Sequence, residues 1–254
     1  MDPVSVTAPA ASVTSRRVLI VMPALNEQAS VGAVIEQVKK SLPGADLLVV
    51  DDGSVDETAK LARAAGADVA RLAVNLGVGG AMRTGFRYAA ARGYDVVVQV
   101  DADGQHDPEE VAALLRGLDE ADIVIGSRFA GKGSYKASGP RKYAMVALSL
   151  VFSRLARRKL TDVTSGFKAM GPKAIKLFAA YYPAEYLGDT VESLVLAIRA
   201  KLTIAEIPVI MRERAGGTPS HSPIKSAVYL SRAGLALLLA LVRRRPAVDS
   251  SDSA

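Results

Sequence analysis

The first half of the chain alternates short apolar runs with segments of helical periodicity. Largely apolar runs occur at residues 18–22, 47–50, 69–72, 96–100 and 123–125. Between the first two runs, apolar residues recur at helical spacing at Val31, Val34, Ile35 and Val38. Strands separated by single helices need crossover connections, which leave the strands parallel and the helices on both faces of the sheet. The pattern therefore predicts an α/β protein, with a mostly parallel central sheet in a single Rossmann-like domain.

Acidic residues follow three of these predicted strands. Glu27 comes after the first strand, Asp51 and Asp52 after the second, and Asp101 and Asp103 after the fourth. Ligands of such sheets bind beyond the carboxyl ends of the strands. We therefore expect these five carboxylates to converge on one crevice.

The segment Asp101-Ala-Asp103 is the candidate metal site. Two carboxylates separated by one small residue can reach a single hard cation and a diphosphate, and Mg²⁺ or Mn²⁺ prefers such oxygen ligands. Gln105 and His106 follow and can add a neutral ligand. A solvated turn is the commonest explanation of an isolated Asp-x-Asp. The position directly after an apolar strand favours the metal site.

Two further loops have features of a nucleotide site. A carboxylate of Asp51-Asp-Gly-Ser54 can accept hydrogen bonds from a base or a ribose, although a capped turn, with Glu57 at capping-box spacing from Ser54, explains the same residues. Gly77-Val-Gly-Gly80 precedes a helix predicted at about residues 79–91. The start of a helix favours anions such as phosphate, and a tight turn is the simpler explanation of the glycines.

Charge and composition narrow the classes of ligand. Residues 1–126 hold 11 Lys and Arg against 18 Asp and Glu, a net charge of −7, whereas residues 127–254 hold 21 against 8, a net charge of +13. An acidic half suits a divalent metal, and a basic half suits phosphates, an anionic membrane or a merely solvated face. With 5 Phe, 8 Tyr and no Trp, and no interleaving of aromatic and basic residues, nucleic-acid binding is not expected.

The lack of cysteine excludes disulfides, thiolate metal sites and a cysteine nucleophile, and it fits a reducing cytoplasm. In the second half, residues 143–155 and 188–200 predict helices, and residues 204–210 predict a strand that Pro208 places at a sheet edge. Residues 129–140 and 212–223 predict loops, and residues 1–15 and 246–254 predict flexible ends.

Residues 224–245 predict an amphipathic helix with basic flanks, which is typical of a membrane surface but also fits core packing. Its apolar run at residues 233–242 is shorter than the roughly 20 residues that span a bilayer. We therefore expect a peripheral protein at the cytoplasmic face of a membrane, with no transmembrane helix.

Five motifs occur together and in order along the chain: Pro23-Ala-Leu-Asn-Glu27, Val49-Val-Asp-Asp-Gly-Ser54, Asn75-Leu-Gly77, Asp101-Ala-Asp-Gly-Gln-His106 and Ile125-Gly-Ser-Arg128. With these motifs the chain resembles the family 2 glycosyltransferases with the GT-A fold, over about residues 16–242. Looser matches at 164–168, 188–192 and 207–209 make it similar to the polyprenyl-phosphate (dolichyl-phosphate) mannose and glucose synthases. The resemblance implies a GT-A catalytic domain at residues 16–223 and a membrane-proximal helix at residues 224–245.

The resemblance also implies roles for individual residues. The nucleotide-sugar donor is bound by Pro23, Leu25, Glu27, Asp52, Gly77, Asp101, Arg212 and Arg214. The metal, Mg²⁺ or Mn²⁺, is held by Asp101, Asp103 and Gln105. The acceptor phosphate is bound by Ser127, Arg128 and Arg141, and the catalytic residues are Asp103, Arg128 and Glu192.

The implied reaction moves a hexose, with inversion, from a donor of the GDP-mannose or UDP-glucose type to a polyprenyl phosphate at the membrane surface. A lipid phosphate is already anionic at neutral pH, so no strong general base is needed. Relatives often carry transmembrane helices after this domain, so a separate membrane-anchoring partner protein is expected.

Two alternatives remain open. A saccharide or other hydroxyl acceptor would need a carboxylate base, for which Glu192 and Asp189 are the candidates, although acidic residues at a helix start also serve as caps. A non-catalytic nucleotide-sugar-binding protein is the second alternative. The complete set of acidic ligands argues against it.

Overall fold

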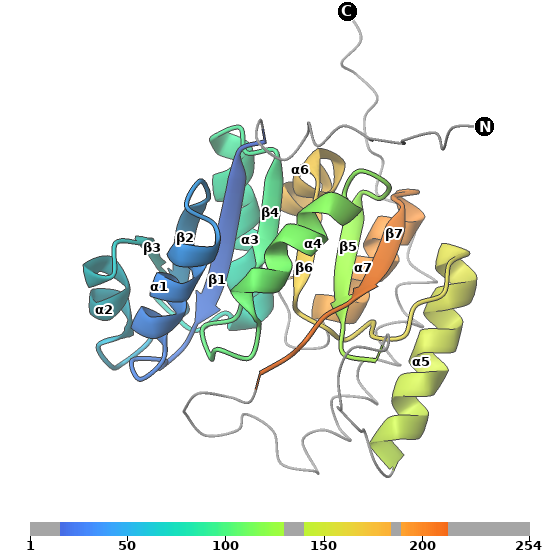
Figure 1. Ribbon diagram of the computed structural model, residues 1–254, viewed down its shortest axis with the longest axis horizontal. Helices are drawn as coiled ribbons and strands as arrows, with labels where there is room; N and C mark the ends of the chain where they lie inside the picture. The colour runs from blue at the N-terminus through green and yellow to red at the C-terminus, as the bar shows by residue number, and fades with distance from the viewer. Residues whose placement is uncertain (1–15, 130–139, 184–188, 213–254) are drawn as a thin grey trace, which may run out of the picture.

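A computed structural model describes residues 16–129, 140–183 and 189–212, and shows helices packed on a central seven-stranded sheet (Figure 1). The strands are β1 (Val18–Ala24), β2 (Asp46–Asp51), β3 (Asp68–Arg71), β4 (Val96–Gln99), β5 (Ile123–Ser127), β6 (Lys168–Met170) and β7 (Ile204–Pro208). The helices are α1 (Val31–Ser41), α2 (Thr58–Ala64), α3 (Gly77–Ala91), the short 3₁₀ helix η2 (Pro108–Glu110), α4 (Val111–Gly117), α5 (Pro140–Ala156), α6 (Pro172–Tyr181) and α7 (Asp189–Arg199).

The sheet is mostly parallel, as the alternating sequence pattern predicts. Its strand order is β3-β2-β1-β4-β6-β5-β7, and β7 lies at an edge, as Pro208 indicates. Only β6 runs antiparallel to its neighbours β4 and β5. Neither β6 nor the following α6 is predicted from the sequence, because a strand of three residues is too short to show a periodicity.

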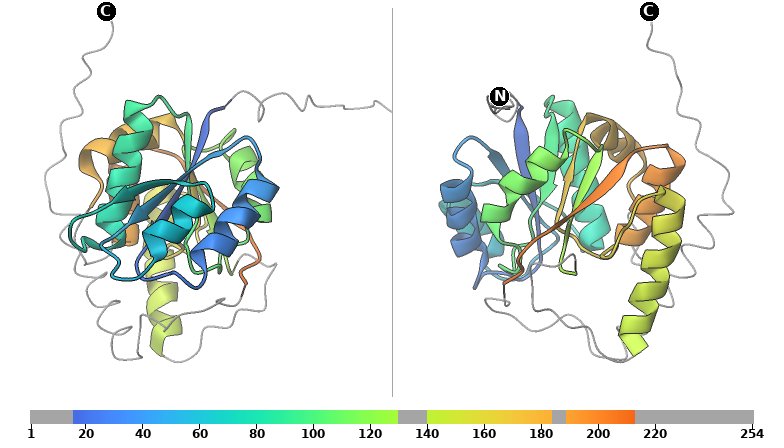
Figure 2. Two further views of the ribbon diagram at one scale, coloured as in Figure 1. Left: turned by 90° about the vertical axis from the view of Figure 1, so that its left-hand side faces the viewer. Right: turned by 45° about the vertical axis from the view of Figure 1, so that its right-hand side comes forward.

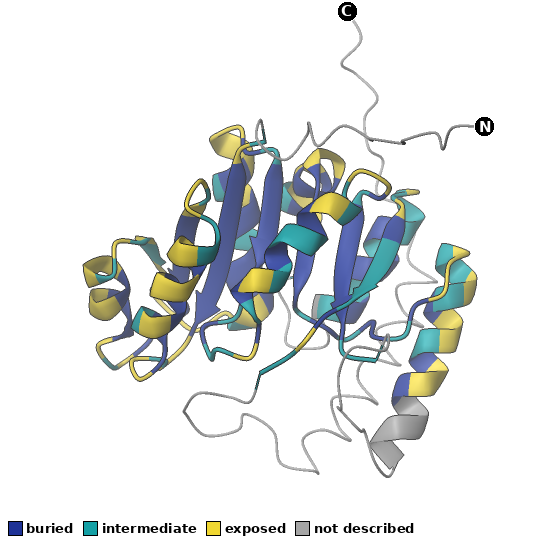
Figure 3. Ribbon diagram, viewed as in Figure 1, coloured by how far each residue is buried: buried dark blue, intermediate teal, exposed yellow. Residues whose placement is uncertain are grey.

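Two apolar cores lie on opposite faces of the sheet. Along β1, Leu19 and Val21 face the helices α3, α5, α6 and α7, whereas Ile20 and Met22 face α1, α2 and α4. This alternation follows from the period of two along a strand. Figure 2 shows helices on both sides of the sheet, and Figure 3 shows that the central strands are buried, whereas the edge strands β3 and β7 are only partly buried and the outer helix faces are exposed.

Several predicted helix starts differ in detail from the observed ones. Ser54 does not cap α2, because its hydroxyl accepts the Asn26 amide at 2.9 Å, and the Asp56 carboxylate accepts the Thr58 amide at 3.0 Å instead. Ser30 precedes α1 but donates its hydroxyl to the Glu27 carboxylate. Asp107 does cap η2, because its carboxylate accepts the Glu109 amide.

The predicted helix at residues 224–245 and the two predicted flexible ends lie outside the described residues. Within the part of the chain that the structure describes, no helix has the length and apolar character needed to cross a bilayer.

Candidate active site

The carboxyl ends of three neighbouring strands form the edge of the sheet on which the acidic motifs lie. Strand β1 lies between β2 and β4, so the segment after Ala24 is flanked by the segment after Asp51 and the segment that begins at Asp101. This placement follows from parallel pairing, which brings the carboxyl ends of the strands to one edge.

The five carboxylates share this edge but do not form one cluster. Asp51 is fully buried, and its two oxygens contact the Ser54 amide at 3.1 Å and the Arg71 guanidinium at 3.2 Å. Among the described residues no group of three His, Cys, Asp or Glu side chains gathers as a metal site. The expected convergence on one crevice is therefore wrong, because buried loop contacts hold Asp51 inside the protein.

Asp52 is also buried and binds the start of α3. Its two carboxylate oxygens accept the amides of Leu76 at 2.7 Å and Gly77 at 2.8 Å. Burial raises the pKa of Asp52, and the two amides offset this rise only in part. The amide of Gly77 therefore contacts a carboxylate of the protein, and the glycines at residues 77–80 form the first turn of α3.

Gly53 allows the Asp52 loop to approach the Asn75 loop. It has φ of +80°, and a Cβ atom at this position would lie 3.2 Å from the Asn75 backbone nitrogen. Glycine adopts this conformation without the steric cost that other residues incur. The motif Asp51-Asp-Gly-Ser54 is thus a buried turn that brings the start of α3 to the site.

The segment after β1 presents a mixed surface beside Asp52. Pro23 is buried within the strand, Leu25 is exposed, and Glu27 is half-buried. The Glu27 carboxylate accepts the Ser30 hydroxyl at 2.9 Å. An exposed apolar side chain and a partly exposed carboxylate on one short segment can contact a planar base and a ribose hydroxyl.

The metal loop, residues 101–107, is shaped by His106. The imidazole is buried, stacks on the Phe167 ring at a centroid distance of 4.8 Å, and accepts the Asp101 amide on Nδ1 at 3.0 Å. An accepting Nδ1 assigns the proton of the neutral ring to Nε2, which lies 3.6 Å from Asp101 Oδ2. His106 therefore shapes the loop from within, rather than lying on the surface.

Asp101 and Asp103 suit a hard divalent cation. The Asp101 side chain is 36% exposed and accepts the Gln99 side-chain amide at 3.0 Å. Asp103 is half-buried and accepts the Gln105 backbone amide at 3.0 Å. Each carboxylate has several lone pairs, so these bonds leave room for a metal bond. A site for Mg²⁺ commonly uses one or two carboxylates and completes its shell with water and substrate phosphate, so this donor set fits.

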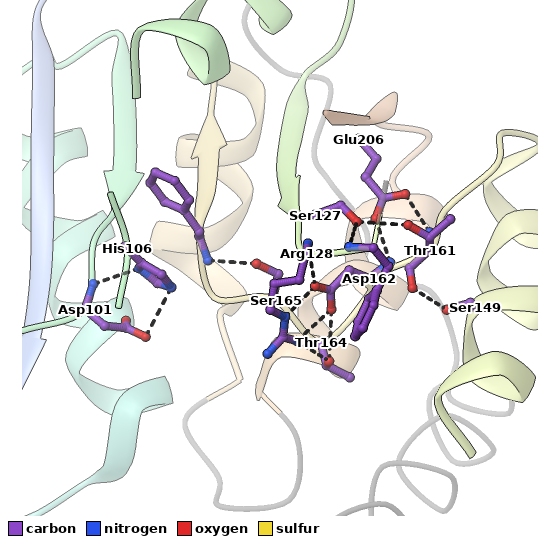
Figure 4. A network of polar contacts seen from close by, with 12 residues as sticks. Asp101, His106, Ser127, Arg128, Ser149, Thr161, Asp162, Thr164, Ser165 and Glu206 are labelled. Carbon is purple, nitrogen blue, oxygen red and sulfur yellow. Dashed lines mark hydrogen bonds and ion pairs between the residues drawn. The ribbon is translucent and has the colours of Figure 1, made fainter. Parts of the chain in front are cut away.

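On the other side of the site, Arg128 follows β5 and contacts a buried acid. Its Nε and Nη2 donate to the two oxygens of Asp162 at 2.6 and 2.8 Å, and its backbone amide donates to the same carboxylate (Figure 4). Ser127 is buried, and its hydroxyl lies 2.9 Å from the Thr161 hydroxyl. The Ser127 hydroxyl also accepts the Phe129 amide at 3.1 Å, so it supports the loop that carries Arg128.

The remaining predicted site residues lie on separate elements of the fold. Arg212 follows β7, and its guanidinium contacts Asp107 at 2.7 and 3.0 Å, so it holds the metal loop. Glu192 is half-buried in the first turn of α7. Arg141 lies in α5, but its side chain is outside the described residues, and Arg214 lies outside them altogether.

Sequence reasoning missed several residues that contact the proposed site residues and hold them in place. They are Gln99, Asp162, Gly166 and Glu206. A Cβ atom on Gly166 would lie 2.9 Å from the Gln99 amide nitrogen and 3.4 Å from Asp101 Oδ2. The motif at residues 164–168 contains one of them, Gly166. The bonds of Asp162 to Arg128 and of Glu206 to the Asp162 amide join residues 34 and 44 positions apart, so only the fold reveals them.

The mostly parallel sheet, with two metal-suited carboxylates after β4 and an arginine after β5, agrees with the GT-A fold that the sequence motifs imply. A likeness to a solved structure agrees with this fold. Glucosyl-3-phosphoglycerate synthase from Mycobacterium tuberculosis, in complex with Mn²⁺, UDP and glucosyl-3-phosphoglycerate, matches with a TM-score of 0.66 and 22% identity, over 89% of this chain and 80% of that chain.

The sequence comparisons identify the family. The model of glycosyl transferase family 2 matches residues 19–177. The chain is 34% identical over 233 residues to undecaprenyl-phosphate mannosyltransferase of Micrococcus luteus, which covers 87% of this chain and 95% of the relative. It is 32% identical over 232 residues to polyprenol monophosphomannose synthase of Mycolicibacterium smegmatis, covering 87% and 88%. The chain belongs to glycosyl transferase family 2, and its predicted similarity to the polyprenyl-phosphate sugar synthases is confirmed.

Proposed function

We propose that this glycosyltransferase moves a hexose, with inversion, from a nucleotide diphosphate sugar to a polyprenyl phosphate, and that it needs Mg²⁺ or Mn²⁺. The observation that carries the proposal is the placement of Asp101 beside residues 164–166, the segment that also contacts Arg128. The names of the two bacterial relatives, a mannosyltransferase and a phosphomannose synthase, support the acceptor class and favour mannose as the sugar.

The donor site would use the edge formed by β1, β2 and α3. Leu25 and Glu27 would contact the nucleoside beside the buried Pro23, while Asp52 would act by holding the Leu76–Gly77 turn in place. Asp101, Asp103 and Gln105 would hold the metal, which neutralises charge on the departing nucleotide diphosphate. Arg212 would keep the metal loop in position through Asp107, and Arg214 is proposed to contact the donor from the adjoining segment.

The acceptor site would use positive charge. Arg128 and Arg141 would bind the acceptor phosphate, with Ser127 supporting the backbone behind them. A phosphate oxygen that is already anionic can attack the anomeric carbon once it is held in line with the leaving group. Glu192 would serve as a base only if the acceptor were a hydroxyl group.

We also propose that the reaction takes place at the cytoplasmic face of a membrane, with residues 224–245 or a separate anchoring protein holding the enzyme there. The lack of cysteine suits a reducing compartment, and a basic second half suits an anionic lipid surface.

A panel of radiolabelled nucleotide sugars, incubated with polyprenyl phosphate in vesicles and Mn²⁺ or Mg²⁺, tests the function. We expect label in an organic-extractable product that mild acid releases. Label that appears only in water-soluble product would refute the lipid acceptor and support a saccharide acceptor.

Metal use is tested with Asp103→Ala. Loss of a metal ligand should cost several kcal/mol of transition-state stabilisation, so we expect turnover to fall by at least about 100-fold. Manganese binding, measured by titration calorimetry in the presence of nucleotide, should weaken in parallel. Unchanged turnover in this variant would rule out the proposed metal site.

A further inference from the structure

Asp162 is a fully buried carboxylate that fixes the orientation of Arg128. Its side chain has no exposed surface, and Arg128 donates to it from Nε, Nη2 and the backbone amide. A bidentate pair between guanidinium and carboxylate fixes the plane of the guanidinium as well as its position. Because the Nε and Nη2 edge faces Asp162, the Nη1 corner of the guanidinium points away from the buried acid.

Asp162 is itself held in place by separate elements. The Glu206 carboxylate on β7 accepts the backbone amides of Thr161 at 2.5 Å and Asp162 at 2.6 Å. The Thr161 carbonyl accepts the Ser149 hydroxyl of α5 at 3.0 Å (Figure 4). The end of β5, the segment between α5 and β6, β7 and α5 therefore all contribute to where the Arg128 guanidinium lies.

The guanidinium and the metal loop flank one short segment. Arg128 Nη2 donates to the Thr164 hydroxyl at 3.1 Å, and two residues later a Cβ atom on Gly166 would lie 3.4 Å from Asp101 Oδ2. The orientation set by Asp162 is thus an orientation relative to the proposed metal site. A 1 Å error in such a placement can cost an enzyme about 100-fold in rate.

We propose that Asp162 is a positioning residue for the acceptor, which acts through Arg128, and that Glu206 supports it through the loop amides. The inference rests on the proposed function, since it assigns Arg128 to the acceptor phosphate. An arginine held in advance loses less conformational freedom when it binds an anion, so its affinity for the anion is higher. The Asp162 carboxylate offsets the positive charge of Arg128. The expected gain in acceptor affinity therefore comes from the fixed orientation of the guanidinium and not from its charge.

The test is steady-state kinetics of Asp162→Asn with polyprenyl phosphate and the nucleotide sugar that the wild-type enzyme accepts. Loss of the charge on Asp162 weakens the bidentate pair that fixes the guanidinium, so we expect KM for the acceptor to rise about tenfold or more. KM for the donor should stay within about twofold, since the donor would bind on the far side of β4. In an Arg128→Ala background, Asp162→Asn should add no further change in the acceptor KM.

Asp122→Asn is the matched control. Asp122 lies just before β5, at the opposite end from Arg128, and its carboxylate contacts Thr203 and Lys173. This variant should lower the thermal midpoint by a similar amount and leave the acceptor KM unchanged. Should Asp162→Asn not fold, Thr164→Val removes the hydroxyl that contacts both Arg128 and Asp162, and it should raise the acceptor KM severalfold.

Two outcomes overturn the inference. One is an equal rise in both KM values, which indicates a general structural role. The other is an additional effect of Asp162→Asn in the Arg128→Ala background. Failure of the wild-type enzyme to use polyprenyl phosphate would instead refute the proposed function, and it is seen before any variant is compared.

Discussion

At the residue scale, the site depends on side chains that are held by other side chains. His106 binds the Asp101 amide and stacks on Phe167, and Asp162 binds Arg128 along one edge. In both cases a buried group with satisfied hydrogen bonds fixes a group that is more exposed. Supporting contacts of this kind are needed, since ligands and charged groups must be held to within a fraction of an ångström.

Gly166→Ala tests how tightly this support is packed. The new methyl group would lie 2.9 Å from the Gln99 amide nitrogen, which is closer than carbon and nitrogen approach without a shift. Gln99 is buried and donates to Asp101, so we expect Asp101 to move and turnover to fall by roughly 10- to 100-fold.

Gly32→Ala is the control for that variant, because a Cβ atom at Gly32 meets nothing within 4 Å. It should leave turnover unchanged. Normal activity of Gly166→Ala would contradict the tight packing against Asp101.

At the element scale, the starts of helices are determined by loops from elsewhere in the chain. Helix α3 begins where the Asp52 carboxylate accepts two amides, and Asp52 is brought there by β2 and the tight turn at Gly53. Helix α2 begins at Thr58 behind Asp56, although Ser54 and Glu57 have capping-box spacing. Spacing alone did not reveal that the Ser54 hydroxyl contacts Asn26.

Asp52→Ala removes the carboxylate that accepts the amides of Leu76 and Gly77, and Gly77 keeps only its bond to the Asn75 side chain among the described contacts. Loss of a helix cap costs about 1 to 2 kcal/mol, so the free energy of unfolding should fall by about that amount. Urea denaturation followed by circular dichroism gives the value.

Glu57→Ala is the matched control, because Glu57 occupies the cap position of α2 without a side-chain capping bond. Its exposed pair with Lys60 contributes little, so we expect a change within about 0.5 kcal/mol. Equal effects of the two variants would contradict the capping role of Asp52.

At the scale of the whole molecule, the two ends of the sheet differ in their function. The carboxyl ends carry the site, whereas the opposite end carries an aromatic and ionic network. There the Tyr94 hydroxyl donates to Asp46 at 2.8 Å, and the Arg17 guanidinium lies 4.7 Å from the centre of the Tyr94 ring. Burial, together with the bond to Asp46, raises the pKa of Tyr94 to about 12.

This raised pKa predicts a loss of stability at high pH. Because the folded-state pKa lies above the unfolded value of about 10, the stabilisation is complete below pH 10 and is lost as the pH rises from 10 to 12. The midpoint of urea unfolding should therefore decrease over this window. Tyr94→Phe should show a smaller decrease, and an identical pH dependence in that variant would contradict the assignment.

Much of the architecture, and the edge of the sheet on which the acidic loops lie, could be predicted from the sequence. Each parallel strand and its following helix are local patterns of apolar residues, so the α/β class, the edge position of Pro208 and the acidic loops after β1, β2 and β4 were predictable. The strand β6 was not, because three residues between β4 and β5 form a strand only through pairing with segments about 70 and 45 residues away.

What only the tertiary structure decided is how each charged group is used. Asp51, Asp52, Asp101 and Asp103 are the same residue type, yet the first two are buried in loop contacts and the last two are partly exposed within the metal loop. Likewise, nothing local marks Asp162 as the partner of Arg128, which lies 34 residues away. Periodicity and motif order are encoded over neighbouring residues, whereas burial and ion pairing arise only when distant segments pack together.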